Sequence, residues 1–280
     1  MIPRLSDITQ LRDFLDHHNI SPSKSMGQNF LVSEEVVESI VEVAQTGPRT
    51  VTELGSGVGV LTQALVESGF MLRAIEKDDE FAALLPSVIS PKKRSKLTVI
   101  HEDLKDVSWS HEEPYQLIGN IPYNLSGYIF RMLTQLEPAP VQAMLLVQKE
   151  VGQRAVAIPP DMNLLSLAIS LWGTAQKVLN VPPNCFWPQP TIHSQILLLA
   201  PHTPPYLPVE KREATMGIAR VFFQQKRKQI GGTLKRALHA PDTLLLQIES
   251  AGISLDSRPQ ELSAEQWYTI SKLCKNAGLG

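Results

Sequence analysis

Short hydrophobic runs of β-forming residues alternate with helix-like segments along the first 150 residues. The β-rich runs are TVTEL (50–54), MLRAIE (71–76), LTVIHED (97–103), YQLIGNI (115–121) and MLLVQ (144–148). Hydrophobic residues with helical spacing begin near Val60, Asp79 and Ser126. Strands that alternate with helices are joined by right-handed crossovers and form a parallel sheet covered on both faces. The pattern therefore predicts an α/β fold, a doubly wound domain with a mostly parallel sheet.

Two further helices are predicted before this alternation begins. Hydrophobic spacing after Ser6 predicts a short amphipathic helix that ends near Asn19, before the turn-rich SPSKSMG stretch. A second helix is expected to begin at Ser33, whose side chain can cap it, with Glu34 and Glu35 at the positive end of the helix dipole. These helices would form an N-terminal extension of the α/β domain.

Prolines mark a change of pattern in the last hundred residues. Two Pro-rich stretches, PPNCFWPQP and PHTPPYLP, flank the β-like run TIHSQILLLA. Beyond them the hydrophobic spacing is helical, at 213–224, 229–238, 242–251 and 263–274. We therefore expect two domains: the α/β domain over residues 1–205 and a small all-α domain over residues 206–280.

Composition restricts the class of protein. Hydrophobic residues make up 43% and charged residues 19% of the 280, which is typical of globular chains and excludes disordered, collagen-like and coiled-coil ones. The apolar runs are far shorter than the roughly 18 residues of a membrane span, and the first ten residues lack a secretory signal pattern. Cys185 and Cys274 are too few and too far apart for a disulfide framework or a metal-ligand set. We expect a protein of the reducing cytoplasm.

Charge is distributed unevenly between the two predicted domains. The formal net charge is −2, with 15 basic and 21 acidic residues in 1–200 but 11 basic and 7 acidic residues in 201–280. The stretch RVFFQQKRKQIGGTLKR contains six cations and no acid: Arg220, Lys226, Arg227, Lys228, Lys235 and Arg236. Such a stretch is either a solvated helix face or an RNA-binding surface. The basic cluster at 92–96 is likewise either a soluble loop or a set of phosphate contacts.

A glycine-rich motif, ELGSGVG (53–59), lies between the first β-rich run and the helix that follows it. Glycines let the backbone turn sharply and approach a ligand beside the free N–H groups of a helix N-terminus. The spacing G-x-G-x-G differs from the dinucleotide pattern G-x-G-x-x-G, and Glu53 precedes Gly55 by two residues. A carboxylate repels a pyrophosphate and attracts a cation. Glu53, Gly55 and Gly57 are therefore interpreted as a site for the sulfonium cofactor S-adenosylmethionine.

Two more acids end the next two predicted strands. Glu76 lies about 20 residues after the glycine motif, where an acid can bind both ribose hydroxyls of a nucleoside. Asp103 ends the third strand and could accept a hydrogen bond from an adenine amine. Each acid taken alone is equally well explained as a helix cap or a surface charge. Three acids at three successive strand ends favour a cofactor site.

The tetrapeptide Asn120-Ile121-Pro122-Tyr123 follows the fourth predicted strand. An amine attached to an aromatic ring is a poor nucleophile, because its lone pair is delocalised. The Asn120 side-chain oxygen and the Ile121 backbone carbonyl could accept the two amine hydrogens and stabilise the positive charge that develops on nitrogen. Tyr123 offers a ring for stacking on a purine, and Phe186 could cover the other face of the base. In isolation the tetrapeptide is also a plain strand-to-turn junction, and Phe186 a packing residue.

Metal and hydrolase chemistry find no support in the sequence. The seven histidines are scattered without metal-ligand spacing, and no serine or cysteine motif accompanies them. We expect neither a zinc site nor a catalytic triad.

Together these motifs resemble those of the rRNA adenine N6,N6-dimethyltransferase family, in particular its bacterial small-subunit (KsgA or RsmA) type. The matching blocks are GQNFL (27–31), ELGSGVGVLT (53–62), AIEKD (74–78), HED (101–103), GNIPYN (119–124), QKEVGQR (148–154), FWPQPTIHS (186–194), FFQQKRK (222–228) and RPQELS (258–263). They follow the family's order over nearly the whole chain. The resemblance implies a Rossmann-like domain that depends on S-adenosylmethionine, followed by a small helical rRNA-binding domain.

The resemblance also implies a reaction and a set of site residues. The family's cofactor contacts fall on Asn29, Leu31, Gly55, Glu76, Asp103 and Asn120. Its target-adenine contacts fall on Asn120, Tyr123 and Phe186. The implied reaction is transfer of two methyl groups from S-adenosylmethionine to adenine N6, on two adjacent adenines near the 3′ end of 16S rRNA in the 30S ribosomal precursor. It needs no metal and no membrane, and a monomer is expected.

Three alternatives remain open. Erm-type enzymes, which methylate large-subunit rRNA, share the GSG and NIPY spellings but generally lack the QKE, FFQQKRK and RPQELS blocks. A binding factor without turnover would be free to lose the acids and NIPY. A methyltransferase for DNA or protein amines would not be expected to have GQNFL and FxPxPxxxS. The chain departs from the family pattern at Gly127-Tyr128 and Gly231-Gly232, where we expect effects on RNA positioning.

Overall fold

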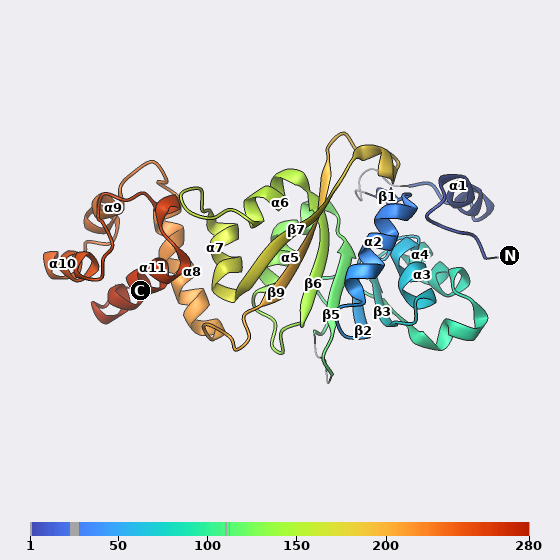
Figure 1. The fold of residues 1–280 in the computed structure, drawn as a ribbon, viewed down its shortest axis with the longest axis horizontal. Coiled ribbons are helices and arrows are strands. Elements are labelled where there is room, and N and C mark those ends of the chain that lie inside the picture. Colours follow the sequence, from blue (N-terminus) through green and yellow to red (C-terminus); the bar gives the residue numbers. More distant parts are fainter. Residues whose placement is uncertain (1, 23–27, 110, 112, 280) are drawn as a thin grey trace. The chain divides into compact units, whose positions relative to one another are not determined.

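The computed structural model describes residues 2–22, 28–109, 111 and 113–279, and within them seven strands form one mixed sheet (Figure 1). Across the sheet the strands are β4 (Leu97–His101), β3 (Met71–Glu76), β2 (Thr50–Leu54), β5 (Gln116–Asn120), β6 (Gln142–Gln148), β9 (Ser194–Pro201) and β7 (Gly173–Val181). Neighbours from β4 to β6 are parallel, and β9 is antiparallel to β6. The predicted doubly wound, mostly parallel sheet is confirmed.

Helices follow the strands as the hydrophobic alternation predicts. The first six are α1 (Ile8–His17), α2 (Glu34–Ala44), α3 (Val60–Glu67), α4 (Asp79–Leu84), α5 (Ser126–Leu133) and α6 (Lys149–Ala155). Ser33 caps α2 as expected, since its Oγ accepts a hydrogen bond from the Val36 N–H at 3.4 Å. The cap of α1 is Asp7, whose carboxylate accepts from the Gln10 N–H at 2.9 Å.

A two-stranded ribbon outside the main sheet joins two of the sequence blocks. Strand β1 (Phe30–Leu31) pairs antiparallel with β8 (Phe186–Trp187), and Leu31 lies opposite Phe186. The Val32 N–H extends the ribbon by donating to the Cys185 carbonyl at 2.7 Å. The ribbon brings the GQNFL and FWPQPTIHS blocks together, although Gly27 of the first block lies outside the described residues.

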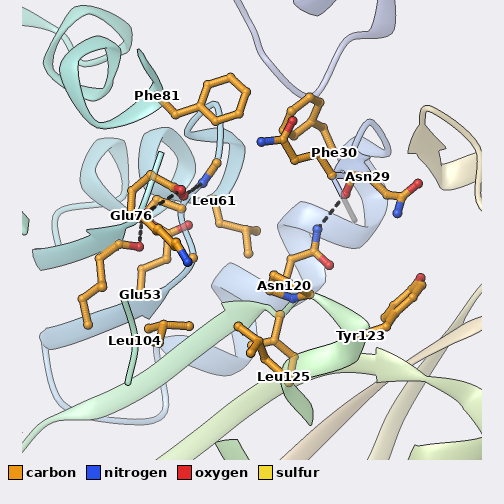
Figure 2. Close-up of a pocket in the computed structure, with 18 of the residues that line it drawn as sticks. Asn29, Phe30, Glu53, Leu61, Glu76, Phe81, Leu104, Asn120, Tyr123 and Leu125 are labelled. Carbon is orange, nitrogen blue, oxygen red and sulfur yellow. Dashed lines mark hydrogen bonds between the residues drawn. The ribbon is translucent and has the colours of Figure 1, made fainter. Parts of the chain in front are cut away.

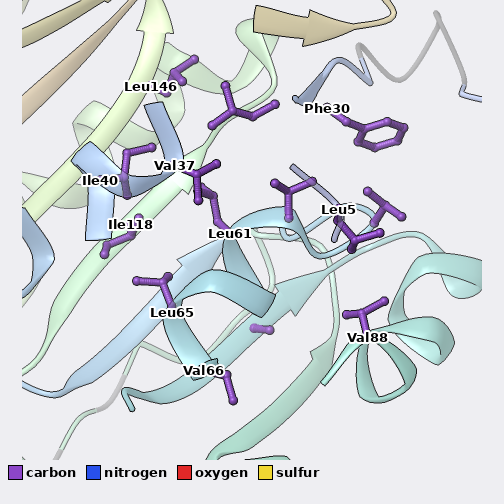
Figure 3. Close-up of a cluster of buried hydrophobic side chains, with 14 of the residues drawn as sticks. Leu5, Phe30, Val37, Ile40, Leu61, Leu65, Val66, Val88, Ile118 and Leu146 are labelled. Carbon is purple, nitrogen blue, oxygen red and sulfur yellow. The ribbon is translucent and has the colours of Figure 1, made fainter. Parts of the chain in front are cut away.

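The N-terminal extension contributes to the hydrophobic core (Figure 3). Leu5, Leu11 and Leu15 are buried, and they belong to the same cluster as Val37 of α2 and Leu61 of α3. Burying one leucine side chain stabilises a fold by about 1.5–3 kcal/mol. The extension is therefore anchored on the α/β core by its own apolar face.

The chain divides into two compact units. The first contains residues 1–129, 136–152 and 176–200, and the second contains 130–135, 153–175 and 201–280. The second unit thus holds the expected helical region 206–280 together with three segments of the first 205 residues, 130–135, 153–175 and 201–205. Arg212 of the second unit binds the segment 130–135 of the same unit. Its guanidinium donates to the Thr134 carbonyl at 3.0 Å and to the Leu207 carbonyl at 2.7 Å.

The second unit is helical. Its helices are α7 (Leu164–Trp172), α8 (Val209–Phe223), α9 (Ile230–Ala237), α10 (Asp242–Ser250) and α11 (Ala264–Asn276). Trp267 and Phe222 are fully buried at its centre, with ring centroids 5.2 Å apart. Leu167 and Leu171 of α7 belong to the same hydrophobic cluster, which explains why this helix groups with the C-terminal ones.

Gly119 in β5 has no room for a side chain. A Cβ at this position would lie 2.8 Å from both the Cβ atom and the backbone oxygen of Leu54 in β2. We predict that Gly119→Ala lowers the free energy of unfolding by about 1–3 kcal/mol, because the two strands must move apart. Gly127→Ala is the matched control, since a Cβ there meets nothing within 4 Å, and its effect should stay within about 0.5 kcal/mol. Urea denaturation of both variants tests this, and equal losses would contradict it.

Candidate active site

A cavity of about 330 Å³ opens at the carboxyl ends of β2, β3 and β5 (Figure 2). Parallel sheets commonly bind ligands at this edge. Ten of the residues singled out from the sequence line it: Asn29, Leu31, Glu53, Gly55, Gly57, Glu76, Asp103, Asn120, Ile121 and Tyr123. The fold therefore gathers at one place residues that lie up to 94 positions apart in the chain.

The glycine motif forms the loop between β2 and α3 on one side of the cavity. The φ angles are positive at three glycines, with +73° at Gly55, +53° at Gly57 and +95° at Gly59. Residues that have a Cβ atom rarely adopt such angles. The N–H groups of Gly55 and Ser56 both donate to the Ile75 carbonyl, at 3.0 and 3.1 Å. A Cβ at Gly57 would lie 3.3 Å from the Phe30 ring. The glycines therefore allow the turn and keep the backbone close to the cavity.

Glu76 is held in place by three backbone N–H groups. One carboxylate oxygen accepts from Gly57 at 2.6 Å, and the other accepts from Lys77 and Asp78, both at 2.9 Å. Burial raises the pKa of Glu76, although the three N–H donors act in the opposite direction. Because each carboxylate oxygen has further lone pairs, a fixed Glu76 can still accept hydrogen bonds from ligand hydroxyl groups.

Glu53 is buried beneath the loop, with 1% of its surface exposed. The Thr62 hydroxyl of α3 donates to its carboxyl group at 2.6 Å. Burial raises the pKa of Glu53 to about 8, and the nearby charge of Glu76 adds to this rise. A carboxyl group in this state ionises readily when a cation comes close.

Asp103 lies at the rim of the cavity and is paired with a lysine. Lys77 Nζ is 2.8 Å from one oxygen, and the Lys105 N–H donates to the other at 3.0 Å. The Lys77 ammonium lowers the pKa of Asp103, and Asp103 in turn raises the pKa of Lys77. Asp103 is therefore an ionised acceptor at the edge of the site.

The Asn120 amide is oriented by the N-terminal segment. Its nitrogen donates to the Asn29 carbonyl at 3.0 Å, next to the β1–β8 ribbon. The amide oxygen takes no part in this bond and remains an acceptor at the end of β5. The bond therefore selects which end of the amide can accept from a ligand amine.

Tyr123 and Phe186 have different surroundings. Tyr123 lines the cavity, and its hydroxyl lies 2.8 Å from Ser194 Oγ. Phe186 is only 2% exposed and packs in the core at the β1–β8 ribbon, and it is not one of the cavity-lining residues. The structure thus places Tyr123 where a base could stack, whereas Phe186 supports the ribbon.

Three side chains around the site were not singled out from the sequence: Thr62, Lys77 and Ser194. Thr62 is a polar residue in an otherwise apolar stripe of α3, which is the only sequence signal for its bond to Glu53. Lys77 directly follows Glu76, and Ser194 ends the FWPQPTIHS block. Lys77 and Ser194 bind partners 26 and 71 residues away in the sequence.

The six cations expected to bind RNA lie in the second unit. They are Arg220 at the end of α8, Lys226, Arg227 and Lys228 in the turn that follows, and Lys235 and Arg236 in α9. All six are exposed. Lys235 lies 3.5 Å from Asp242, and Arg236 Nε donates to the Gly232 carbonyl at 3.1 Å. The Gly231-Gly232 departure thus adjoins this surface, because a Cβ on Gly232 would meet the Arg236 guanidinium at 2.8 Å.

The basic cluster at 92–96 is largely used within the fold. Lys93 pairs with the Glu67 carboxylate at 3.0 Å, and Lys96 donates to the Gly69 carbonyl at 3.1 Å. Arg94 donates to the Ile89 carbonyl at 3.3 Å. Lys93 and Lys96 therefore bind groups at the C-terminal end of α3 and the turn beside it, whereas Arg94 binds the backbone just before its own segment.

The described part of the chain offers neither a metal-binding cluster nor a membrane-spanning helix. Among the described residues there is no group of three or more histidine, cysteine or acidic side chains placed to hold a metal ion. None of the helices in these ranges is long and apolar enough to cross a membrane.

Comparison with known proteins gives consistent matches over most of the chain. Residues 20–276 match the family model described as "Ribosomal RNA adenine dimethylase". The protein named ribosomal RNA small subunit methyltransferase A from Acidobacterium capsulatum is 37% identical over 257 residues, 88% of this chain and 90% of the relative. The protein of the same name from Syntrophotalea carbinolica is 32% identical, over 91% of this chain and 97% of the relative.

Solved structures share the fold. A dimethyladenosine transferase from Plasmodium falciparum superposes with a TM-score of 0.79 at 21% identity, over 89% of this chain and 98% of the other. The 23S rRNA methyltransferase ErmE superposes with a TM-score of 0.71 at 22% identity, over 88% and 100%. These likenesses confirm the α/β fold with its C-terminal helices.

Glu53 is expected to make the free energy of unfolding depend on pH. Its pKa is higher in the folded chain than the ordinary 4.5, so the folded state binds this proton more tightly. The resulting stabilisation is complete below about pH 4.5 and is lost as the pH rises through about 8. We predict that Glu53→Gln, which cannot ionise, removes this loss.

Chemical denaturation at several pH values tests the prediction. Exposed Glu35→Gln on α2 is the control for removing one acid. Relative to Glu53→Gln, the wild type and the control should both lose stability as the pH rises through this range. Parallel pH profiles for all three proteins would contradict the raised pKa.

Proposed function

This chain belongs to the ribosomal RNA adenine dimethylase family, and from that premise we propose that it transfers two methyl groups from S-adenosylmethionine to N6 of adenines in small-subunit rRNA. The small-subunit assignment is supported by the names of relatives that are 37% and 32% identical. The observation that carries the proposal is the Asn120 amide, whose nitrogen is bound to the Asn29 carbonyl and whose oxygen remains an acceptor.

The cavity residues fit S-adenosylmethionine. A volume of about 330 Å³ lies within the range of small-molecule sites. Glu76 is fixed and retains lone pairs for two ribose hydroxyls, and Asp103 is an ionised acceptor for the adenine amine. Glu53 is a buried acid with a raised pKa, which a cationic ligand would ionise. When bound, this cofactor supplies the methyl group of its sulfonium centre. The rest of the cofactor is then a neutral thioether, which serves as the leaving group.

The residues of NIPY act on the target adenine. Asn120 Oδ1 and the Ile121 carbonyl would accept the two hydrogens of the exocyclic amine and stabilise the positive charge that develops on N6. Tyr123 would stack on the base, which must leave its helix to enter the cavity. Each transfer forms one N–C bond, and the N6 proton then leaves to water. Holding the two reactants in line supplies much of the acceleration.

The exposed cations of the second unit would bind the RNA backbone. The chain as a whole is slightly acidic, so the contact with RNA depends on this local surface and not on overall charge. The proposed partner is the precursor of the small ribosomal subunit. Since such particles assemble in the bacterial cytoplasm, this is the proposed place of action.

Methyl transfer to ribosomal particles tests the proposal. Labelled S-adenosylmethionine is incubated with the protein and small-subunit particles from cells that lack the modification, with large-subunit rRNA beside them, and nucleosides are identified by mass spectrometry. Dimethyladenosine in the small-subunit sample alone is the expected result. Label only in the large-subunit RNA would indicate an Erm-type enzyme, and no label in either would contradict the proposed reaction.

Asn120→Ala should remove most of the transfer activity. The variant loses the acceptor that stabilises charge on N6, and single groups of this kind contribute about 100-fold or more to a rate. The single-turnover rate with saturating cofactor is the measurement. Exposed Asn276→Ala in α11 should leave the rate unchanged. An Asn120→Ala rate within threefold of the wild type would show that the amide has no catalytic role.

Removing cations after α8 should weaken RNA binding and its dependence on salt. In the test variant, alanine replaces Lys226, Arg227 and Lys228. A charge-matched control replaces three exposed lysines elsewhere in the second unit: Lys211, Lys272 and Lys275. Each lost phosphate contact reduces the slope of log K against log salt by about 0.7–0.9. Filter binding over a range of salt should show a slope reduced by about 2 in the test variant and nearly unchanged in the control; equal slopes would place the RNA elsewhere.

A further inference from the structure

The phenol of Tyr123 is bound to a serine 71 residues further along the chain. The two hydroxyl oxygens lie 2.8 Å apart, and Ser194 is completely buried. A tyrosine hydroxyl is protonated at neutral pH, and burial raises the pKa of Tyr123 further, so this hydroxyl is able to donate in the bond. Burial also excludes the water that would otherwise compete for Ser194 Oγ.

Both partners of this bond are fixed by the backbone around them. Ser194 opens β9 opposite Gln148 of β6, and the preceding carbonyl, of His193, accepts from the Lys149 N–H at 3.0 Å. The Tyr123 carbonyl accepts from the Ser126 hydroxyl at 3.0 Å. The tyrosine is therefore held at its backbone and at its hydroxyl, while its ring lines the cavity.

We propose that Ser194 is a positioning residue for the methyl transfer. Its hydroxyl holds the Tyr123 ring at the place from which it stacks on the target adenine. The hydroxyl oxygen lies on the axis of the Cβ–Cγ bond, so anchoring it restricts rotation about Cα–Cβ, which sets where the ring lies. Because a phenol O–H prefers the plane of the ring, the same bond also favours one orientation of that plane. The inference rests on the proposed function, because it assigns Ser194 to the adenine side of that site. It gives the FWPQPTIHS block two separate tasks, with Phe186 supporting the ribbon at one end and Ser194 orienting Tyr123 at the other.

A double-mutant cycle tests the inference. Ser194→Ala, Tyr123→Phe and the double variant are compared in single-turnover transfer to small-subunit particles. Each single variant removes the same bond and should slow transfer about tenfold, and the double variant should be no slower than either. The affinity for S-adenosylmethionine should be unchanged, because the bond lies on the adenine side. Ser271→Ala, a buried serine of α11, is the control for losing a buried hydroxyl.

Several results would overturn the inference. These are a Ser194→Ala rate equal to that of the wild type, losses that multiply in the double variant, or cofactor affinity that falls in parallel with the rate. If Ser194→Ala does not fold, the inference is still tested by Tyr123→Phe, because that variant lacks the same hydrogen bond. That variant transferring at the wild-type rate would equally contradict the positioning role.

A measurement without substrate separates this inference from the proposed reaction. Fluorotyrosine at position 123 gives a fluorine NMR signal that reports the motion of this ring. Ser194→Ala should narrow the line and shift it towards that of an exposed tyrosine, whereas Ser271→Ala should not. An unchanged signal would overturn the positioning role. If the wild type methylates neither RNA, the reaction is wrong, while this signal still decides whether Ser194 orients the ring.

Discussion

Two neighbouring carboxyl groups buried at the ends of β2 and β3 constrain everything around the cavity. Glu76 accepts hydrogen bonds from three backbone N–H groups, one of them that of Gly57, which has a positive φ. Glu53 has the Thr62 hydroxyl, and its raised pKa keeps it protonated until a cation arrives. The glycine loop therefore does more than make room for a ligand. Through Gly57 it also supplies one of the three hydrogen bonds that fix the Glu76 carboxylate.

The adenine side of the site is organised by segments remote from NIPY. Strand β5 lies between β2 and β6, so its carboxyl end meets the glycine loop on one side and the β6–β9 pair on the other. The Asn29 carbonyl beside the β1–β8 ribbon orients Asn120, and Ser194 of β9 holds Tyr123. Both contacts involve buried or half-buried polar groups, whose hydrogen bonds are costly to lose. The order of the strands thus brings an acceptor and a stacking ring to the same edge.

The sequence predicted the sheet and the meeting of the three acids at one cavity, because periodic hydrophobic runs determine strands and the carboxyl ends of parallel strands meet at one edge. It was less informative where partners come from distant segments. Phe186 lies in the core instead of at the cavity, and Lys93 and Lys96 bind groups at the end of α3. Helix α7 belongs with the C-terminal helices through its leucines. None of these contacts produces a periodic pattern of hydrophobic residues from which the sequence could have predicted it.

Proton release on cofactor binding tests the central claim that a buried, protonated Glu53 awaits a cation. The enthalpy of S-adenosylmethionine binding is measured calorimetrically at pH 7 in buffers with different ionisation enthalpies, for the wild type and for Glu53→Gln. Because its pKa of about 8 should fall when the sulfonium binds, the wild type should release close to one proton more than the variant. Equal proton release by the two proteins would show that Glu53 is not the group that meets the cation.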